Sequence, residues 1–341
     1  MATQEQLGLV ETAYHRLYRA APGYRWWKPL IAVALVGLFI LIATGTVAVF
    51  AVTAVTIAQG GVVDVAEMEA MFLPDTQQPL TLLLALGSTA LWLPCVAFAL
   101  WTVGIRPMGR LSSVALRLRW GLLLRCVLPA IGALVGVQAL SMAYELLVPG
   151  ALGGQAAAPV PVELGPALIS LVLILVLVPL QAAAEEVVFR GVLMQALGSW
   201  FRSPLLPILI PTVIFASLHI YDPWGLAQVA LMGLTAGWLT WRTGGLEAAI
   251  VIHVINNVTV FALMTTGLTG ETGMTEAGGN LLSLIVSAAM FAIYAWFVVR
   301  IMDRGPWQRT MRATPEPPMP QPLAVTPLSL AGDSAAIEEQ R

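Results

Sequence analysis

Two adjacent glutamates and an arginine interrupt an otherwise apolar stretch of the chain, AAAEEVVFR at residues 182–190. Glu186 and Arg190 are four residues apart, so on a helix they share one face and can form a buried ion pair. Glu185 points about 100° away from Glu186 and has no local partner of opposite charge. A carboxylate buried in this way suits general acid–base catalysis near neutral pH. The alternative is structural: the three groups mark the cytoplasmic end of a membrane span, and their side chains extend towards water.

Two of the three histidines also lie in apolar segments. His219 ends the stretch FASLH, and His253 begins the stretch HVINN. Asn257 follows His253 by four residues, so both side chains project from one helical face, whereas Asn256 points elsewhere. A lone histidine in such a segment can simply be a hydrogen-bonded core residue. His15, in the polar N-terminal segment, is expected to be an ordinary surface residue.

The composition shows which elements must position these groups. The chain has 341 residues, of which 58% are hydrophobic and 11% charged, and its mean hydropathy is +0.83. Soluble domains carry about 25% charged residues, and a spanning helix needs about 20 apolar residues. We therefore predict an all-α, polytopic membrane bundle of about eight transmembrane helices. The predicted spans are 30–57, 81–104, 120–147, 165–197, 204–220, 224–241, 246–266 and 280–301.

The charges along the chain predict the orientation of the bundle. Lys and Arg lie before the first span, after the eighth, and in every second loop, whereas the alternate loops carry only acidic charges. This is the positive-inside pattern for eight spans with both termini cytoplasmic. Of the 17 basic residues 16 are Arg, a bias typical of GC-rich prokaryotic genes. We expect a multi-pass protein of the cell (inner or plasma) membrane whose partner is the lipid bilayer, with no nucleic-acid partner.

The chain divides by composition. Residues 1–28 are predicted to be a cytoplasmic N-terminal segment, and residues 303–341, with seven prolines, a disordered cytoplasmic tail. The first three helices occupy 29–147 and the last helix 280–302. Cys95 and Cys126 both fall in apolar spans, which argues against a disulfide framework or a cysteine metal site.

Chain spacing predicts which site residues meet. Position 202, midway between Glu185 and His219, lies in the turn GSWFRSP, so these two residues should be level in an antiparallel hairpin. His253 is only about eight residues, or ~12 Å, beyond its own turn. It reaches the same level only if the hairpin of the fourth and fifth helices projects about two to three turns further into the cytoplasm. On that assumption, the site lies in the cytoplasmic half of the membrane.

The stretches EEVVFR, FASLH and HVINN resemble the EExxxR, FxxxH and HxxxN motifs of a known family. This is the type II CAAX prenyl endopeptidase family, also called the CAAX protease and bacteriocin-processing (CPBP) family of intramembrane proteases. The resemblance covers about residues 165–270, which we interpret as the protease core. It implies a peptidase site in which Glu186 and Arg190 support the catalytic groups.

The resemblance also implies roles for the other motif residues. Glu185 with His219 would activate a water molecule for attack on a peptide carbonyl. His253 and Asn257 would stabilise the oxyanion, and donors aimed at developing negative charge are each worth about 2.7–4 kcal/mol.

Metal dependence is open at this stage. Glu185, His219 and His253 could supply the three protein ligands of a catalytic zinc, with Glu186 as the general base. The chain has no HExxH motif, and the two histidines come from different predicted helices. We therefore favour a glutamate-dependent protease that requires no cofactor over one that uses Zn²⁺.

The resemblance implies an endopeptidase that acts near the C-terminus of a membrane-associated or prenylated (CAAX-type) peptide, with its active site toward the cytoplasm. One alternative is a catalytically idle scaffold or bacteriocin-immunity protein on the same fold. Another is a proton-coupled transporter in which Glu185, His219 and His253 form a relay.

Overall fold

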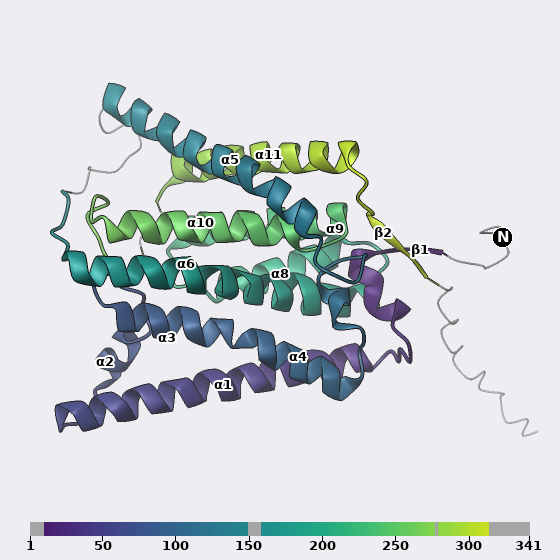
Figure 1. The fold of residues 1–341 in the computed structure, drawn as a ribbon, viewed down its shortest axis with the longest axis horizontal. Helices are drawn as coiled ribbons and strands as arrows, with labels where there is room; N and C mark the ends of the chain where they lie inside the picture. Colours follow the sequence, from purple (N-terminus) through teal and green to yellow (C-terminus); the bar gives the residue numbers. More distant parts are fainter. Residues whose placement is uncertain (1–9, 149–157, 277–278, 314–341) are drawn as a thin grey trace, which may run out of the picture.

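Long apolar helices lie side by side in the computed structural model, which describes residues 10–148, 158–276 and 279–313 (Figure 1). The helices along the bundle are α1 (Lys28–Gln59), α3 (Pro79–Ala90), α4 (Trp92–Val103), α5 (Trp120–Leu147), α6 (Leu164–Glu186), α8 (Leu205–Ser217), α9 (Pro223–Thr243), α10 (Glu247–Thr265) and α11 (Leu281–Arg304). The shorter elements are β1 (Val10–Ala13), η2 (Tyr14–Ala20), α2 (Val65–Ala70), η3 (Met108–Leu111), η4 (Val187–Leu193), α7 (Met194–Gly198) and β2 (Thr310–Ala313). The predicted multi-pass helical bundle is therefore present.

Six helical segments in the described part of the chain are long and apolar enough to cross a membrane. They are α1, α3 with α4, α5, α6 through α7, α10 and α11. Each of the eight predicted spans contains a helix, but the count of eight is not confirmed. The α8 helix has only 13 residues, or about 20 Å at 1.5 Å per residue. The α9 helix is not among the six.

The α6 and α10 helices form the centre of the bundle. In the apolar 18-residue stretch of each of these segments, 39% is buried inside the bundle, compared with 11% in α1. The α6 helix packs between α3 and α10, and α10 also packs against α5 and α9. Their apolar side chains thus contact other helices, whereas most of α1 presents its side chains outward. Polar groups on α6 and α10 are consequently shielded from the surroundings of the bundle.

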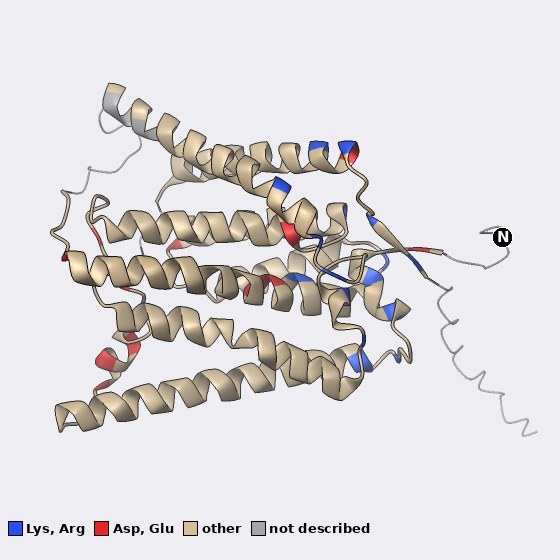
Figure 2. Cartoon of the chain, in the orientation of Figure 1, with Lys and Arg blue, Asp and Glu red and all other residues tan. Residues whose placement is uncertain are grey.

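Charges gather at opposite ends of the bundle (Figure 2). Lys and Arg lie mainly at the end that carries β1 and β2, which we call the basic end. The loops 60–78, 218–222 and 266–276 lie at the opposite, acidic end, and contain Asp and Glu but no Lys or Arg. This separation is the one predicted from the sequence, because alternate loops fall at alternate ends.

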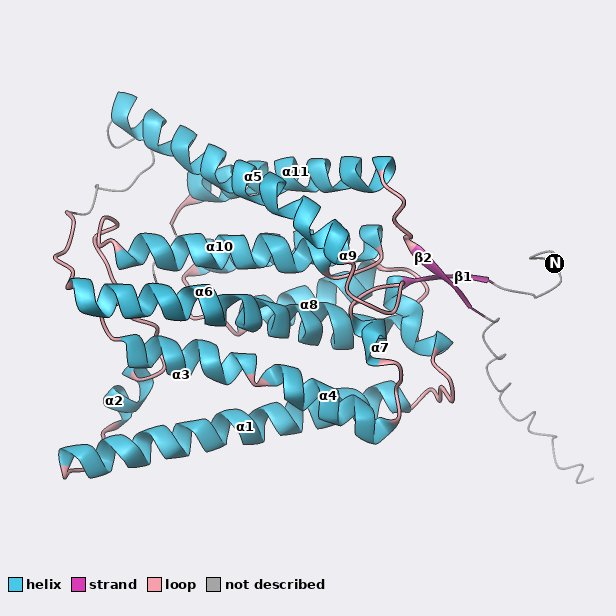
Figure 3. Ribbon diagram, in the orientation of Figure 1, coloured by secondary structure: helices cyan, strands magenta, loops and turns pink. Residues whose placement is uncertain are grey.

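A small antiparallel sheet joins the two termini of the described chain (Figure 3). In this sheet Val10 pairs with Ala313, and Ala13 pairs with Thr310. The all-α prediction is therefore wrong in this detail. The prediction of a disordered tail is wrong for 303–313, where α11 continues to Arg304 and β2 follows, while 314–341 lie outside the described residues. Strands of four residues that pair across nearly the whole chain leave no periodic signal in the sequence.

The N-terminal segment packs against the end of α7. His15 is buried, and its Nε2 lies 3.0 Å from the carbonyl oxygen of Arg202, so the prediction of a surface histidine is wrong. Arg19 donates from Nη1 to the carbonyl oxygen of Ser199 at 3.0 Å. Basic side chains at a helix C-terminus satisfy its last carbonyls and complement its dipole. The segment thus holds the end of the helix that carries the paired glutamates.

Candidate active site

The paired glutamates lie at the end of α6, where the α-helix is followed by a π-helix. Glu185 and Glu186 end the α-helical part, and the next seven residues, Val187–Leu193, form a π-helix. Such wide turns are uncommon and frequent at functional sites. Arg190 lies within this turn, and its Nη1 donates to Glu186 Oε1 at 2.9 Å; both side chains are buried. The predicted ion pair is present.

Arg190 is held on three sides. Besides Glu186, its Nη2 donates to the carbonyl oxygen of Gly233 at 3.1 Å. Its guanidinium carbon lies 4.7 Å from the centre of the Phe215 ring, within cation–π range. A Cβ at Gly233 would lie only 3.1 Å from Nη2. Gly233 and Gly237 form a GxxxG pattern, which permits the close approach of helices in membranes.

His253 lies between the two glutamates. Its Nδ1 is 2.8 Å from Glu186 Oε1, and its Nε2 is 3.3 Å from Glu185 Oε2. Within the described chain, Glu185 Oε2 has no geometrically acceptable hydrogen-bond partner. The ring therefore contacts both carboxylates. Glu185 and His253 lie at the same depth in the bundle, as they would if the hairpin of the fourth and fifth predicted helices projected further into the cytoplasm. The histidine beside Glu185 is His253, although the hairpin alone suggested His219.

His219 joins the same group through Phe215. His219 Nδ1 donates to the Phe215 carbonyl oxygen at 2.8 Å, which leaves Nε2 as a hydrogen-bond acceptor in the neutral ring. The Phe215 ring meets His219 edge to face, with centroids 4.9 Å apart, and lies 5.9 Å from the His253 ring. The buried Phe215 thus separates and orients the two histidines.

A chain of amides continues from the histidines. Asn256 donates to Asn257 Oδ1 at 3.1 Å, and Asn257 donates to Gln181 Oε1 at 3.2 Å. Asn256 borders the same cavity as Asn257, so the prediction that it points elsewhere is wrong. Gln181 was not predicted. Its signal was present, because it precedes Glu185 by four residues on the same apolar helix.

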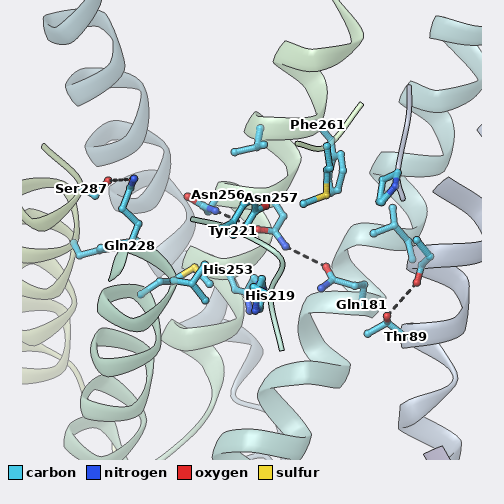
Figure 4. Close-up of a pocket in the computed structure, with 18 residues that line it drawn as sticks. Thr89, Gln181, His219, Tyr221, Gln228, His253, Asn256, Asn257, Phe261 and Ser287 are labelled. Carbon is cyan, nitrogen blue, oxygen red and sulfur yellow. Dashed lines mark hydrogen bonds between the residues drawn. The ribbon is translucent and has the colours of Figure 1, made fainter. Parts of the chain in front are cut away.

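A cavity of about 340 Å³ brings these polar groups together (Figure 4). Its volume falls in the range of ligand pockets, about 300–1,000 Å³. Polar side chains that line it include Gln181, His219, Gln228, His253, Asn256 and Asn257. Apolar side chains that line it include Leu86, Phe261 and Phe291. Of the six predicted site residues, three line the cavity, and the Glu185–Glu186–Arg190 group adjoins it through His253.

The ligands named for the zinc alternative, Glu185, His219 and His253, do not form a three-ligand site. In the described residues, no group of three His, Cys, Asp or Glu side chains is arranged to hold a metal ion. Glu185 and His253 are in contact, whereas within the described chain no ion pair or hydrogen bond joins His219 to either of them. Since the three side chains do not fit that ligand set, no step proposed below runs through a metal.

Comparison with known proteins supports the predicted resemblance. Residues 167–259 match the model of the family described as type II CAAX prenyl endopeptidase Rce1-like. This is the family that the three motifs indicated, and the match contains Glu185, Glu186, Arg190, His219, His253 and Asn257. It contains the parts of α6, α9 and α10 that carry Gln181, Gln228 and His253 into the cavity wall, whereas α3 and α11, which also line the cavity, lie outside it.

One curated relative is similar to this chain over a short region. The uncharacterized protein YyaK of Bacillus subtilis (strain 168) is 34% identical over 98 residues, which is 27% of this chain. The match spans about a third of the length of that relative, 33%. No solved structure matches the chain.

Proposed function

We propose that this protein is an intramembrane endopeptidase that hydrolyses a membrane-associated or prenylated (CAAX-type) peptide near its C-terminus. The observation that carries the proposal is the position of His253, between Glu185 and Glu186 at the wall of a cavity lined by both polar and apolar side chains. The family match supports the class of reaction. The alternative of an ordinary snorkelling charge group is disfavoured by the near-complete burial of Glu186 and Arg190.

Charge balance makes this arrangement stable enough to persist in an apolar helix. The Arg190 guanidinium offsets the buried Glu186 carboxylate, with 2.9 Å between Arg190 Nη1 and Glu186 Oε1. Since a carboxylate oxygen accepts, His253 Nδ1 donates to Glu186, and Nε2 lies 3.3 Å from Glu185. Buried charges are tolerated when they are paired and hydrogen-bonded in this way.

In the proposed reaction, Glu185 accepts a proton from a water molecule as the water oxygen attacks the peptide carbonyl carbon. The Nε2 acceptor of His219 orients that water, because its Nδ1–H is fixed on Phe215. The attack converts the carbonyl into a tetrahedral oxyanion. The C–N bond then breaks, and the amine leaves with the proton that Glu185 had taken.

The donors to the oxyanion are His253 and Asn257. Once Glu185 has taken the proton from water, no negative charge remains beside His253 Nε2, and an N–H at this position would donate to the oxyanion as it forms. Asn257 uses one amide N–H on Gln181 and keeps the second for the substrate. Glu186 and Arg190 act as positioning residues, because they hold the ring through Nδ1.

The proposal is tested by peptide cleavage with purified, detergent-solubilised protein. Wild type is compared with Glu185→Ala on a pool of farnesylated and unmodified membrane-binding peptides, and products are read by mass spectrometry. Glu163→Ala is the matched control, because this glutamate lies at the start of the same helix and is exposed. We expect cleavage by wild type and the control but not by Glu185→Ala. Equal cleavage by all three would contradict the assigned site, and retention of the cellular phenotype in Glu185→Ala would favour an idle scaffold.

A further inference from the structure

The cavity is built from the acidic end of the bundle. Pro74, Tyr221 and Met274, which all lie in loops at this end, form part of its wall. The neighbouring wall residues Gln228 and Ser287 lie in the first two turns of α9 and α11. The cavity therefore extends from the level of these loops down to His253.

Two further pockets share lining residues with the first. One, of about 360 Å³, lies among residues 270–275 and shares Met274. The other, of about 170 Å³, lies between α5, α10 and α11 and shares Gln228, Asn256, Val260 and Ser287. The first cavity alone has both residues of the acidic loops and the His253 ring in its wall.

The basic end is closed by packed and hydrogen-bonded groups. Arg119 forms a buried ion pair with Glu247, at 2.7 Å, and donates to the carbonyl oxygen of Gln308 at 2.7 Å. Tyr14 donates to the carbonyl oxygen of Leu111. None of the three cavities has a lining residue in the described segments 10–27, 104–119, 199–204, 242–246 or 305–313. These segments form the basic end.

The distribution of Lys and Arg along the chain indicates which end of the bundle faces the cytoplasm. Residues 29–105, 126–189, 203–241 and 243–299 contain no Lys or Arg, and they include every loop at the acidic end. By the positive-inside rule, the basic end is cytoplasmic and the acidic end faces the other side. Glu185 is 21 residues beyond Leu164 and 13 before Gly198, so it lies nearer the cytoplasmic end of its helix.

We infer that the cavity takes its peptide from the non-cytoplasmic side of the membrane, although the reacting groups lie deep in the bundle. This reverses the predicted access from the cytoplasm. The substrate class is then a membrane-anchored peptide whose scissile bond is presented at the outer face, such as the outward end of a membrane protein or a secreted lipidated peptide. The inference rests on the proposed function for the peptide, but the side of access can be measured without any catalysis.

Access is tested by labelling single cysteines with a membrane-impermeant maleimide in sealed vesicles of either orientation. Cys95 and Cys126 are first replaced by alanine. Met274→Cys and Val260→Cys report on the upper and deeper cavity, and Ser203→Cys, in the exposed turn at the basic end, is the matched control. We expect both cavity positions to be labelled in right-side-out vesicles and to lose labelling in inside-out vesicles, with the opposite result for Ser203→Cys. Labelling of Val260→Cys only in inside-out vesicles would overturn the inference.

The wild-type protein provides a second test, independent of the cysteine replacements. A cleavable peptide identified with purified protein is added outside sealed vesicles of each orientation. Cleavage in right-side-out vesicles and its loss in inside-out vesicles would support access from the outer face, and the reverse would overturn it. If purified protein cleaves no peptide, the proposed function fails alone, and the maleimide result still decides the side of access.

Discussion

Glu186 and His253 are 67 positions apart in the chain, yet Glu186 Oε1 lies 2.8 Å from His253 Nδ1. The same oxygen accepts from Arg190 Nη1 at 2.9 Å. One carboxylate oxygen thus fixes both the π-helical turn of α6 and the histidine of α10. This leaves the second ring nitrogen of His253 to face Glu185, so the two adjacent glutamates have different tasks.

Glu185→Gln should remove catalysis and leave the fold intact. Glutamine has nearly the same shape but cannot accept a proton from water, and general-base catalysis contributes about 10²–10⁴-fold. We therefore expect kcat to fall by about that factor with little change in thermal unfolding. Glu163→Gln, an exposed residue before α6, should keep wild-type kcat. Equal kcat for both variants would show that another group accepts the proton.

Arg190→Met should act mainly on stability. It leaves Glu186 buried without its cation, and breaking a buried ion pair in this way costs about 3–5 kcal/mol. The measurement is the free energy of unfolding in a single detergent. Arg242→Met removes a partner of the exposed Asp303, 4.0 Å away, and should leave the free energy of unfolding nearly unchanged. Similar losses for the two variants would mean that the Glu186–Arg190 pair is not desolvated as the structure indicates.

Gly233→Ala should disturb the same site from α9. The added Cβ would lie 3.1 Å from Arg190 Nη2 and 3.0 Å from Thr212 Cγ2, tighter than ordinary contacts. We expect a lower unfolding temperature and a lower kcat, because Arg190 must shift and Glu186 follows it. Gly132→Ala is the matched control, since a Cβ there would meet nothing within 4 Å. An unchanged kcat in Gly233→Ala would show that the position of Arg190 does not affect catalysis.

Much of the fold was predictable because lipid imposes a strong pattern on the sequence. Long apolar runs mark α1, α5, the continuous segment from α6 to α7, and α11 to within a few residues, since a spanning helix must satisfy its own backbone. The α8 and α9 helices were placed correctly, but whether they span depends on packing around the site. The β1–β2 pairing was not predictable, because it depends on the meeting of two four-residue segments from opposite ends of the chain.

The candidate site was predictable as a set of residues but not as a set of contacts. Charged and polar side chains in apolar helices are conspicuous, and Glu186 with Arg190 follows from helical spacing alone. That His253, not His219, lies beside Glu185 depends on how α10 packs against α6, which no local pattern encodes. Asn256 was assigned to another face because helical spacing cannot show which neighbouring faces border one cavity, whereas Gln181 had a usable signal in its four-residue spacing from Glu185.

Stability should depend on pH through His15, outside the membrane-spanning helices. Burial lowers the pKa of His15 from its ordinary value of 6.5. The unfolded chain therefore binds a proton at a higher pH than the folded chain does, and stability is lost as pH falls below about 6.5. We expect the unfolding temperature of wild type to fall between pH 7.5 and 5. His15→Gln should show a smaller fall over this range, and an equal fall would assign the effect to other groups.

Peptide cleavage should withstand chelation. The proposed reaction uses the Glu185 carboxylate and three donor or acceptor side chains, and His253 has both ring nitrogens against carboxylates. A zinc ion held by Glu185, His219 and His253 would have to break that contact and draw His219 toward it. We therefore expect unchanged kcat after EDTA treatment and dialysis, with zinc content well below one equivalent by mass spectrometry. One equivalent of zinc in active protein, with cleavage lost to EDTA and restored by zinc, would replace the carboxylate mechanism with a metal-dependent one.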